Sequence, residues 1–115
     1  MDIDVVYISG GNTFKMMHTL RQCSFDQEII RLVRSGVTYI GGSAGAHLAS
    51  SDLSHLTCYD DVPDGMLDFS GMNSFRGILL CHFSPDRQAH YSRLREELEF
   101  DVCALTDEDT LVISS

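Results

Sequence analysis

A glycine-rich pentapeptide, placed between an apolar run and a helical pattern, constrains this chain more than any other feature. Residues 41–45 read Gly-Gly-Ser-Ala-Gly, a match to G-x-S-x-G, and they follow the β-branched and aromatic run of residues 37–40. Small residues around a serine permit the sharp turn that leads from a strand into a helix, and this turn exposes the hydroxyl at the carboxyl end of the strand. The pentapeptide predicts a nucleophile elbow at Ser43, and a plain strand-to-helix turn is the competing interpretation.

Short apolar runs alternate with helical patterns along the 115 residues. Strands are expected at residues 5–8, 37–40, 77–81, 102–105 and 110–113. Helices are expected after Asn12, after Ser24, at residues 44–51 and after Ser84. This alternation is typical of an α/β fold with a mostly parallel sheet and flanking helices, and the length suits a single domain spanning residues 1–115.

The expected helix ends carry their own signals. Asn12 is a favourable N-cap for the first helix, and Ser24 with Gln27 has the spacing of a capping box for the second. Gly36 is expected to end that second helix, since glycine adopts the left-handed conformation that follows many helices. Residues 52–70 show no clear periodicity, and a long irregular stretch in a compact domain is often functional.

Charge and cysteine pattern narrow the classes of partner. Lys and Arg number 8 and Asp and Glu 17, so the formal net charge is −9, which argues against nucleic acid and anionic membranes. No apolar run approaches the ~18 residues of a membrane span, and the first residues lack the basic segment of a signal peptide. The four cysteines have no C-x-x-C spacing and are expected to be reduced thiols of a cytoplasmic protein: Cys23, Cys58, Cys81 and Cys103.

His82 is the best candidate for the base that a serine nucleophile needs. It stands at the end of the expected strand 77–81, and parallel strands end at the same edge of a sheet, so Ser43 and His82 can meet there. A hydrogen-bonded strand-end histidine is the competing interpretation, and His47 and His55 are weaker candidates for the base. The five histidines form no H-E-x-x-H pair, so no metal and no cofactor is expected.

A carboxylate that orients the imidazole would complete the constellation. Asp60 and Asp61 lie between Ser43 and His82 in the chain and are the leading candidates, with a solvated acidic loop as the competing interpretation. Weaker candidates lie on either side of them: Asp52, Asp64 and Asp68. The residues alone leave this group open between Asp60, Asp61 and none.

A second glycine turn follows the first expected strand. Gly10 and Gly11 stand at the carboxyl end of residues 5–8, where their N–H groups can complete an oxyanion hole with the N–H of Ala44. A simple strand-to-helix turn is the competing interpretation. The spacing fits neither Walker A nor G-x-G-x-x-G, so a phosphate cradle is not expected.

Three segments together resemble a known family. Residues 9–14 (Ser-Gly-Gly-Asn-Thr-Phe), residues 39–46 (Tyr-Ile-Gly-Gly-Ser-Ala-Gly-Ala) and His82 after its strand resemble peptidase E. That family comprises α-aspartyl dipeptidases, serine hydrolases related to cyanophycinases, on the class I glutamine-amidotransferase-like fold, a flavodoxin-like three-layer arrangement. The resemblance implies these roles: nucleophile Ser43, general base His82, acid Asp61, and oxyanion donors Gly10, Gly11 and Ala44.

The resemblance also implies a substrate class, namely short peptides cleaved through an acyl-enzyme. The expected substrate-binding residues are Asn12, Thr13, Arg87 and His90. Aspartyl dipeptidases carry an arginine in the helix after the histidine, but alignment through residues 93–96 puts His90 at that place and leaves Arg87 out of register. An absolute requirement for an N-terminal aspartate is therefore not expected.

Members of the resembled family are nearly twice as long as this chain. The resemblance implies that the usual N-terminal strands are lacking, so an apolar strand and part of the core face are expected to lie open. A homodimer is expected to cover them. Two other functions compete with the peptidase: an α/β-hydrolase esterase, and a truncated, catalytically impaired peptidase E-like protein that acts as an interaction module.

Overall fold

The computed structural model describes residues 3–98, 101–109 and 111. Within these ranges strands and helices alternate and the paired strands are parallel, so the prediction of an α/β fold with flanking helices is confirmed. The last expected strand falls largely outside the described residues, because its members Thr110, Val112 and Ile113 are not described.

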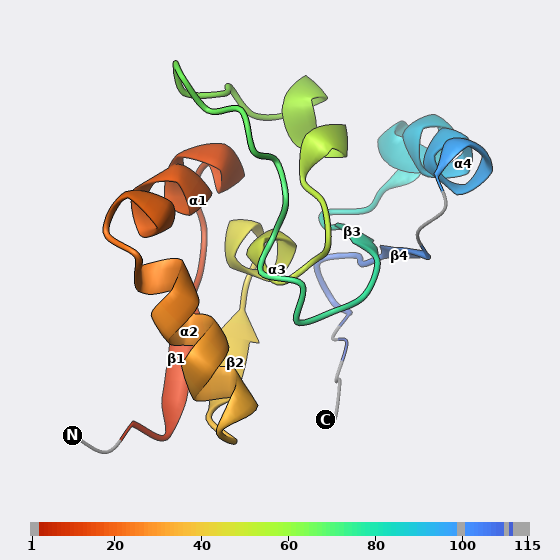
Figure 1. Ribbon diagram of the computed structural model, residues 1–115. Helices are drawn as coiled ribbons and strands as arrows, with labels where there is room; N and C mark the ends of the chain where they lie inside the picture. The colour runs from red at the N-terminus through yellow and green to blue at the C-terminus, as the bar shows by residue number, and fades with distance from the viewer. Residues whose placement is uncertain (1–2, 99–100, 110, 112–115) are drawn as a thin grey trace.

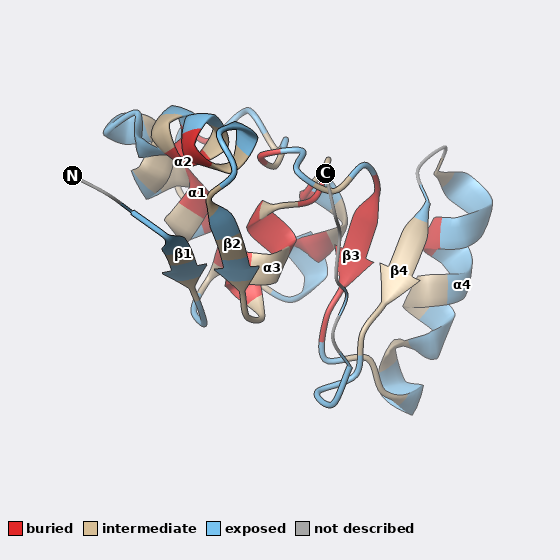
Figure 2. Cartoon of the chain, turned by 90° about the horizontal axis from the view of Figure 1, so that it is seen from below, coloured by how far each residue is buried: buried red, intermediate tan, exposed pale blue. Residues whose placement is uncertain are grey.

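Among the described residues, four short strands form two parallel pairs, β1 with β2 and β3 with β4. Their bounds are Val5–Ile8 for β1, Thr38–Gly41 for β2, Ile78–Leu80 for β3 and Val102–Ala104 for β4. The registers place Ile8 opposite Gly41 and Leu80 opposite Ala104. Figure 2 shows all four strands pointing in one direction. The turns that follow β1, β2 and β3 therefore gather at the same edge, where α/β folds place their ligands.

Helices connect the strands (Figure 1). Their bounds are Thr13–Gln22 for α1, Phe25–Arg34 for α2, Ala44–Leu48 for α3, Ser54–Cys58 for the 3₁₀-helix η1, Pro85–Arg87 for the 3₁₀-helix η2, and Gln88–Glu97 for α4. The short helix α3 contacts β1, β2 and β3, and it also contacts α1. No helix in the described ranges is long and apolar enough to cross a membrane.

The helix ends agree with the sequence in two of three cases. The Asn12 side chain accepts the N–H of Lys15 at 3.1 Å and caps α1. Gly36 follows the end of α2 with φ +105°, the conformation expected of it. The capping box at Ser24 is wrong: Ser24 precedes α2 with φ +59° and its side chain makes no capping bond. Gln27 instead donates to the neighbouring Asp26 carboxylate at 3.3 Å.

The irregular segment of residues 52–70 is part of the core. Leu53 and Leu56 are fully buried, and Phe69 packs edge-on against Phe14 of α1, with ring centroids 5.7 Å apart. These contacts hold α1, which starts beside the first glycine turn, against the rest of the chain. The core cluster of buried side chains comprises Phe14, Met17, Ile29, Leu48, Leu53, Leu56, Met66 and Met72.

One face of the β1–β2 pair carries exposed apolar side chains. Val5, Tyr7 and Ile40 are 49, 64 and 47% exposed, whereas the alternating residues Val6 and Ile8 pack against the core. Side chains alternate between the two faces of a strand, so the exposed three share one face. This is the open apolar strand expected from the sequence, and the homodimer that would cover it stays a prediction.

Candidate active site

Ser43 occupies a sharp turn between β2 and α3. Its backbone has φ +53° and ψ −115°, an uncommon conformation for a residue with a side chain. The flanking glycines are required by close packing: a Cβ on Gly45 would overlap the carbonyl oxygen of Ile8, and one on Gly41 would overlap the carbonyl of Gly45. The predicted elbow geometry is therefore present, with the serine as the first residue before α3.

A half-buried tyrosine, Tyr39, holds the side of this elbow opposite the serine. The Tyr39 hydroxyl donates to the Gly45 carbonyl at 2.5 Å. Burial raises the pKa of Tyr39, so the phenol stays protonated and remains a donor. The elbow is thus tied both to β2 through Tyr39 and to β1 through the N–H of Gly42, which donates to the Ile8 carbonyl at 2.9 Å.

His82 connects the serine to a carboxylate. The Ser43 Oγ lies 2.7 Å from His82 Nε2, and His82 Nδ1 lies 2.6 Å from Asp107 Oδ1. This arrangement suits a neutral imidazole that accepts the serine proton at Nε2 and donates Nδ1–H to the carboxylate. The side chains of His82 and Asp107 are 51 and 77% exposed, so the three residues lie open to solvent and to a substrate.

Asp107 is the functional candidate that the sequence reasoning missed. It lies in a turn after β4, which is closed by the Asp109 carboxylate accepting the N–H of Thr106 at 2.9 Å. The parallel pairing continues past the strands, since the N–H of Phe83 donates to the Leu105 carbonyl at 2.8 Å. That pairing carries Asp107 to the side of His82. The sequence feature that could have indicated Asp107 is its place just after the expected strand 102–105, the first strand that follows His82.

Asp61 and its alternative Asp60, the acids expected from the sequence, do not contact His82 in the structure. Asp107 occupies that place instead. The Asp60 carboxylate accepts the N–H of Thr13 at 3.1 Å, and the Asp61 carbonyl accepts the side-chain amide of Asn12 at 2.9 Å. Both aspartates thus hold the start of α1. Thr13 is 1% exposed, which places its side chain in the interior and not at a substrate surface.

The expected oxyanion donors lie around the nucleophile. Gly10 and Gly11 follow β1 and Ala44 follows Ser43 directly, and the register of Ile8 with Gly41 brings the two turns side by side. Among the described residues, the amides of Gly10, Gly11 and Ala44 donate no backbone or side-chain hydrogen bond.

The two rival histidines have structural partners. His55 Nε2 lies 2.9 Å from the Leu79 carbonyl oxygen, to which it donates. His47 is 5% exposed; its Nε2 accepts the N–H of Cys81 at 3.1 Å and its Nδ1 lies 3.4 Å from the Thr13 hydroxyl. Burial lowers the pKa of His47 to about 3, and the neighbouring His55, Arg87 and His82 act in the same direction because each disfavours a further positive charge. His47 is therefore neutral.

The neutral state of His47 makes the fold sensitive to acid. Its pKa is about 3 in the folded chain against an ordinary value of 6.5. Below pH 6.5 the unfolded chain takes up a proton that the folded chain does not, so the free energy of unfolding falls with pH by up to about 1.4 kcal/mol per unit. We expect His47 to lower the free energy of unfolding by about 2 kcal/mol between pH 7 and pH 5. Urea unfolding at the two pH values measures this loss.

The matched control for this loss is His47→Gln, which has no titrating group in that range. The variant should lose less stability than the parent chain over the same interval. His55, whose pKa burial also lowers, contributes with the same sign and remains in both proteins. Equal losses in the two proteins would contradict the assignment to His47.

The other expected substrate-binding residues, Arg87 and His90, surround Tyr59. The Arg87 guanidinium lies over the Tyr59 ring, 3.8 Å from its centroid, and its Nη1 donates to the Cys81 carbonyl at 2.6 Å. His90 Nδ1 lies 2.6 Å from the Tyr59 hydroxyl. Both residues are thus engaged within the chain, close to the strand end that carries His82.

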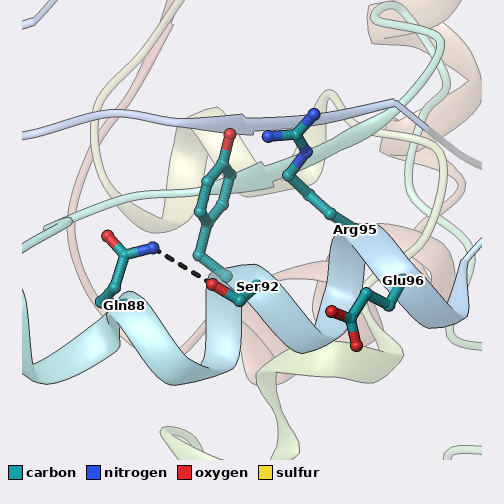
Figure 3. Close-up of a pocket in the computed structure, with 5 residues that line it drawn as sticks. Gln88, Ser92, Arg95 and Glu96 are labelled. Carbon is teal, nitrogen blue, oxygen red and sulfur yellow. Dashed lines mark hydrogen bonds between the residues drawn. The ribbon is translucent and has the colours of Figure 1, made fainter.

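A separate hollow lies on α4 (Figure 3). Figure 3 shows Gln88 donating to Ser92, an interaction of 3.1 Å. The residues that line it are Gln88, Tyr91, Ser92, Arg95 and Glu96. This lining includes none of Ser43, His82 and Asp107, so the hollow is separate from the three residues joined by hydrogen bonds.

A family model and similar curated proteins both relate this chain to the same peptidase family. The model of peptidase family S51 matches residues 1–115. Peptidase E of Citrobacter koseri is 44% identical over 116 residues, covering 96% of this chain and 48% of that protein. Peptidase E of Streptomyces coelicolor is 33% identical over 97 residues, covering 84% of this chain and 40% of that protein.

A solved structure shows the same fold. The 1.5 Å crystal structure of a candidate peptidase E protein from Listeria monocytogenes superimposes with a TM-score of 0.77 and 22% identity, covering 90% of this chain and 52% of that one. The chain therefore spans about half the length of the relatives that it matches.

Proposed function

This chain belongs to peptidase family S51, and we propose that it is a serine-type peptidase that hydrolyses short peptides in the manner of a dipeptidase. The observation that carries the proposal is the row of Ser43, His82 and Asp107, joined at 2.7 and 2.6 Å. A serine, a histidine and a carboxylate in this order recur on unrelated folds wherever a serine hydroxyl must be activated.

Acylation follows from the order of the three side chains. The Ser43 Oγ attacks the scissile carbonyl carbon while His82 Nε2 takes the hydroxyl proton. Asp107 holds the imidazole by accepting Nδ1–H and stabilises the positive charge that forms on it. When the tetrahedral intermediate collapses, the C–N bond breaks and His82 returns the proton to the leaving amine, which leaves an ester on Ser43.

The negatively charged oxygen of the tetrahedral intermediate needs hydrogen-bond donors to stabilise it. The N–H of Ala44, next to the nucleophile, and the N–H groups of Gly10 and Gly11 are the proposed hydrogen-bond donors. Deacylation repeats the steps with water as the nucleophile: His82 removes a proton from water, the ester breaks, and Ser43 regains its hydrogen. No step requires a group beyond those that the chain provides.

The contacts of Arg87 within the chain support an enzyme that accepts many different N-terminal side chains in its substrates. Its guanidinium lies on Tyr59 and donates to the Cys81 carbonyl, which leaves fewer donors for a carboxylate. His90 is held by Tyr59 in a similar way. These contacts support a weak preference for acidic residues rather than an absolute requirement for one.

The test combines active-site labelling with a panel of dipeptides. A fluorophosphonate should modify the chain at Ser43, as mapped by mass spectrometry, because the probe reacts with an activated serine. Ala-Leu, Gly-Leu and Asp-Leu should all be hydrolysed, with kcat/KM for Asp-Leu within about tenfold of that for Ala-Leu. Heat-denatured protein is the control for both measurements.

Three outcomes are informative. Neither labelling nor hydrolysis would contradict the proposal and favour the competing function, a catalytically impaired interaction module. Labelling at a serine other than Ser43 would contradict the proposed nucleophile. A hundredfold preference for Asp-Leu would leave the mechanism intact and show that a cation reads the acidic side chain.

A further inference from the structure

The residue before the base is held from two sides. Cys81 is 5% exposed; its N–H donates to His47 Nε2 at 3.1 Å, and its carbonyl accepts from Arg87 Nη1 at 2.6 Å. One contact comes from α3, the helix that begins at the nucleophile, and the other from η2, just after the base. The backbone that leads into His82 is therefore fixed by two side chains that take no part in the proposed proton transfers.

His47 is the more informative of the two, because its position links three elements. It lies on α3, four residues after Ser43, and its ring contacts Cys81, the residue after β3, and Thr13, the first residue of α1. An imidazole that accepts a backbone N–H at Nε2 carries its proton at Nδ1, where it faces the Thr13 hydroxyl at 3.4 Å. Burial of the ring keeps it in that neutral form.

His82 needs such support. Its backbone has φ +55°, a left-handed conformation that costs an ordinary residue free energy and persists only where the surroundings enforce it. An unpaired, buried N–H at Cys81 would remove one of the constraints directly before this residue. The imidazole of His82 would then lose its fixed distance from the Ser43 hydroxyl.

We infer that His47 is a positioning residue for catalysis, which sets the distance between the nucleophile and the base by joining the Ser43 helix to the backbone of Cys81. The inference rests on the proposed peptidase function for its kinetic consequences. The contact itself is independent of that function, and this makes the two separable by experiment.

Two conservative variants separate the contacts of the ring. In His47→Gln the side-chain amide oxygen reaches the place of Nε2 and can still accept the N–H of Cys81. In His47→Asn the shorter side chain keeps a polar group near Thr13 but cannot reach Cys81. We expect the asparagine variant to lose about 10- to 100-fold in kcat with KM nearly unchanged, because a small displacement of a catalytic group costs this much.

The glutamine variant should stay within about fivefold of the parent kcat, since the acceptor is retained. The rate of fluorophosphonate labelling at Ser43 should follow kcat in all three proteins, because it reports the serine and its base without a bound peptide. Equal activity and equal labelling rates in the folded asparagine variant would overturn the inference. So would equal losses in the two variants, which indicate a structural role alone.

Two NMR measurements do not depend on activity. In the parent chain, imidazole ¹⁵N shifts should show His47 as the neutral Nδ1–H form at pH 7, and the Cys81 amide should exchange slowly with solvent. Faster exchange at Cys81 in the asparagine variant but not in the glutamine variant confirms the contact. A protonated His47 or the Nε2–H form overturns the inference even if the asparagine variant does not fold. Absence of labelling in a parent chain with the expected NMR signature would instead contradict the proposed function.

Discussion

Replacing Ser43 with alanine is expected to lower kcat for dipeptide hydrolysis by on the order of 10⁴-fold or more. The substitution removes the oxygen that lies 2.7 Å from His82 Nε2 and that is the proposed nucleophile. His82→Ala should cost a similar factor, because serine is a weak nucleophile without a base. The two losses should not add in the double variant, since the pair acts as a unit.

The matched control is Ser92→Ala, which removes an exposed serine on α4 that contacts Gln88. Its kcat should equal that of the parent chain within the error of the assay. Unfolding in urea checks that all four variants, the double variant included, keep their fold. Turnover by a folded Ser43→Ala protein at more than a few per cent of the parent rate would show that another group attacks the substrate.

Replacing Asp107 with asparagine is the second large effect. Asparagine keeps the size of the side chain but has no charge to stabilise the imidazolium, and its amide can hold the ring with the wrong nitrogen protonated. We expect kcat to fall on the order of 10²- to 10³-fold, which is less than the loss that removing a buried triad acid causes. The reason is that Asp107 is exposed, so water can reach it and replace part of its role.

Asp61→Asn is the informative comparison for Asp107→Asn. The contact of Asp61 with Asn12 uses its backbone carbonyl, so the substitution leaves that hydrogen bond in place. Its kcat should stay within about threefold of the parent value, since no catalytic group loses a partner. The reverse pattern, with Asp61→Asn inactive and Asp107→Asn active, would restore the acid first expected from the sequence.

The local features of the site could be predicted because each is encoded by neighbouring residues. The elbow needs small residues at Gly41 and Gly45, and these stand beside Ser43 in the sequence where a β-branched run ends. His82 follows an apolar run in the same way. The parallel direction of the strands then brings two strand ends to one edge, which is a property of the whole fold class.

Asp107 could not be found in this way, because its position depends on a pairing between distant segments. The register of β3 with β4 decides which residue of the following turn reaches the histidine, and no local pattern encodes that register. Asp107 also follows the base in the chain, whereas Asp60 and Asp61 precede it. This acidic pair is used instead to hold the start of α1 through Thr13.

The capping box failed for a related reason. Ser24 and Gln27 have the correct spacing, but α1 and α2 are joined so closely that Ser24 takes a left-handed backbone conformation. An N-cap side chain needs extended backbone to reach the first turn of its helix. Sequence spacing cannot reveal that the preceding helix ends only two residues earlier.

Ser43 and His82 both have a positive φ, and this backbone conformation lowers the stability of the fold. Each positive φ at a residue with a Cβ costs roughly 1–2 kcal/mol, which a glycine at the same position would not incur. Selection for a more stable fold alone would therefore drive both positions toward glycine, and both substitutions would remove a reacting side chain. Ser43 and His82 thus stand at two positions whose backbone favours glycine, and the proposed chemistry gives a reason why each carries a side chain.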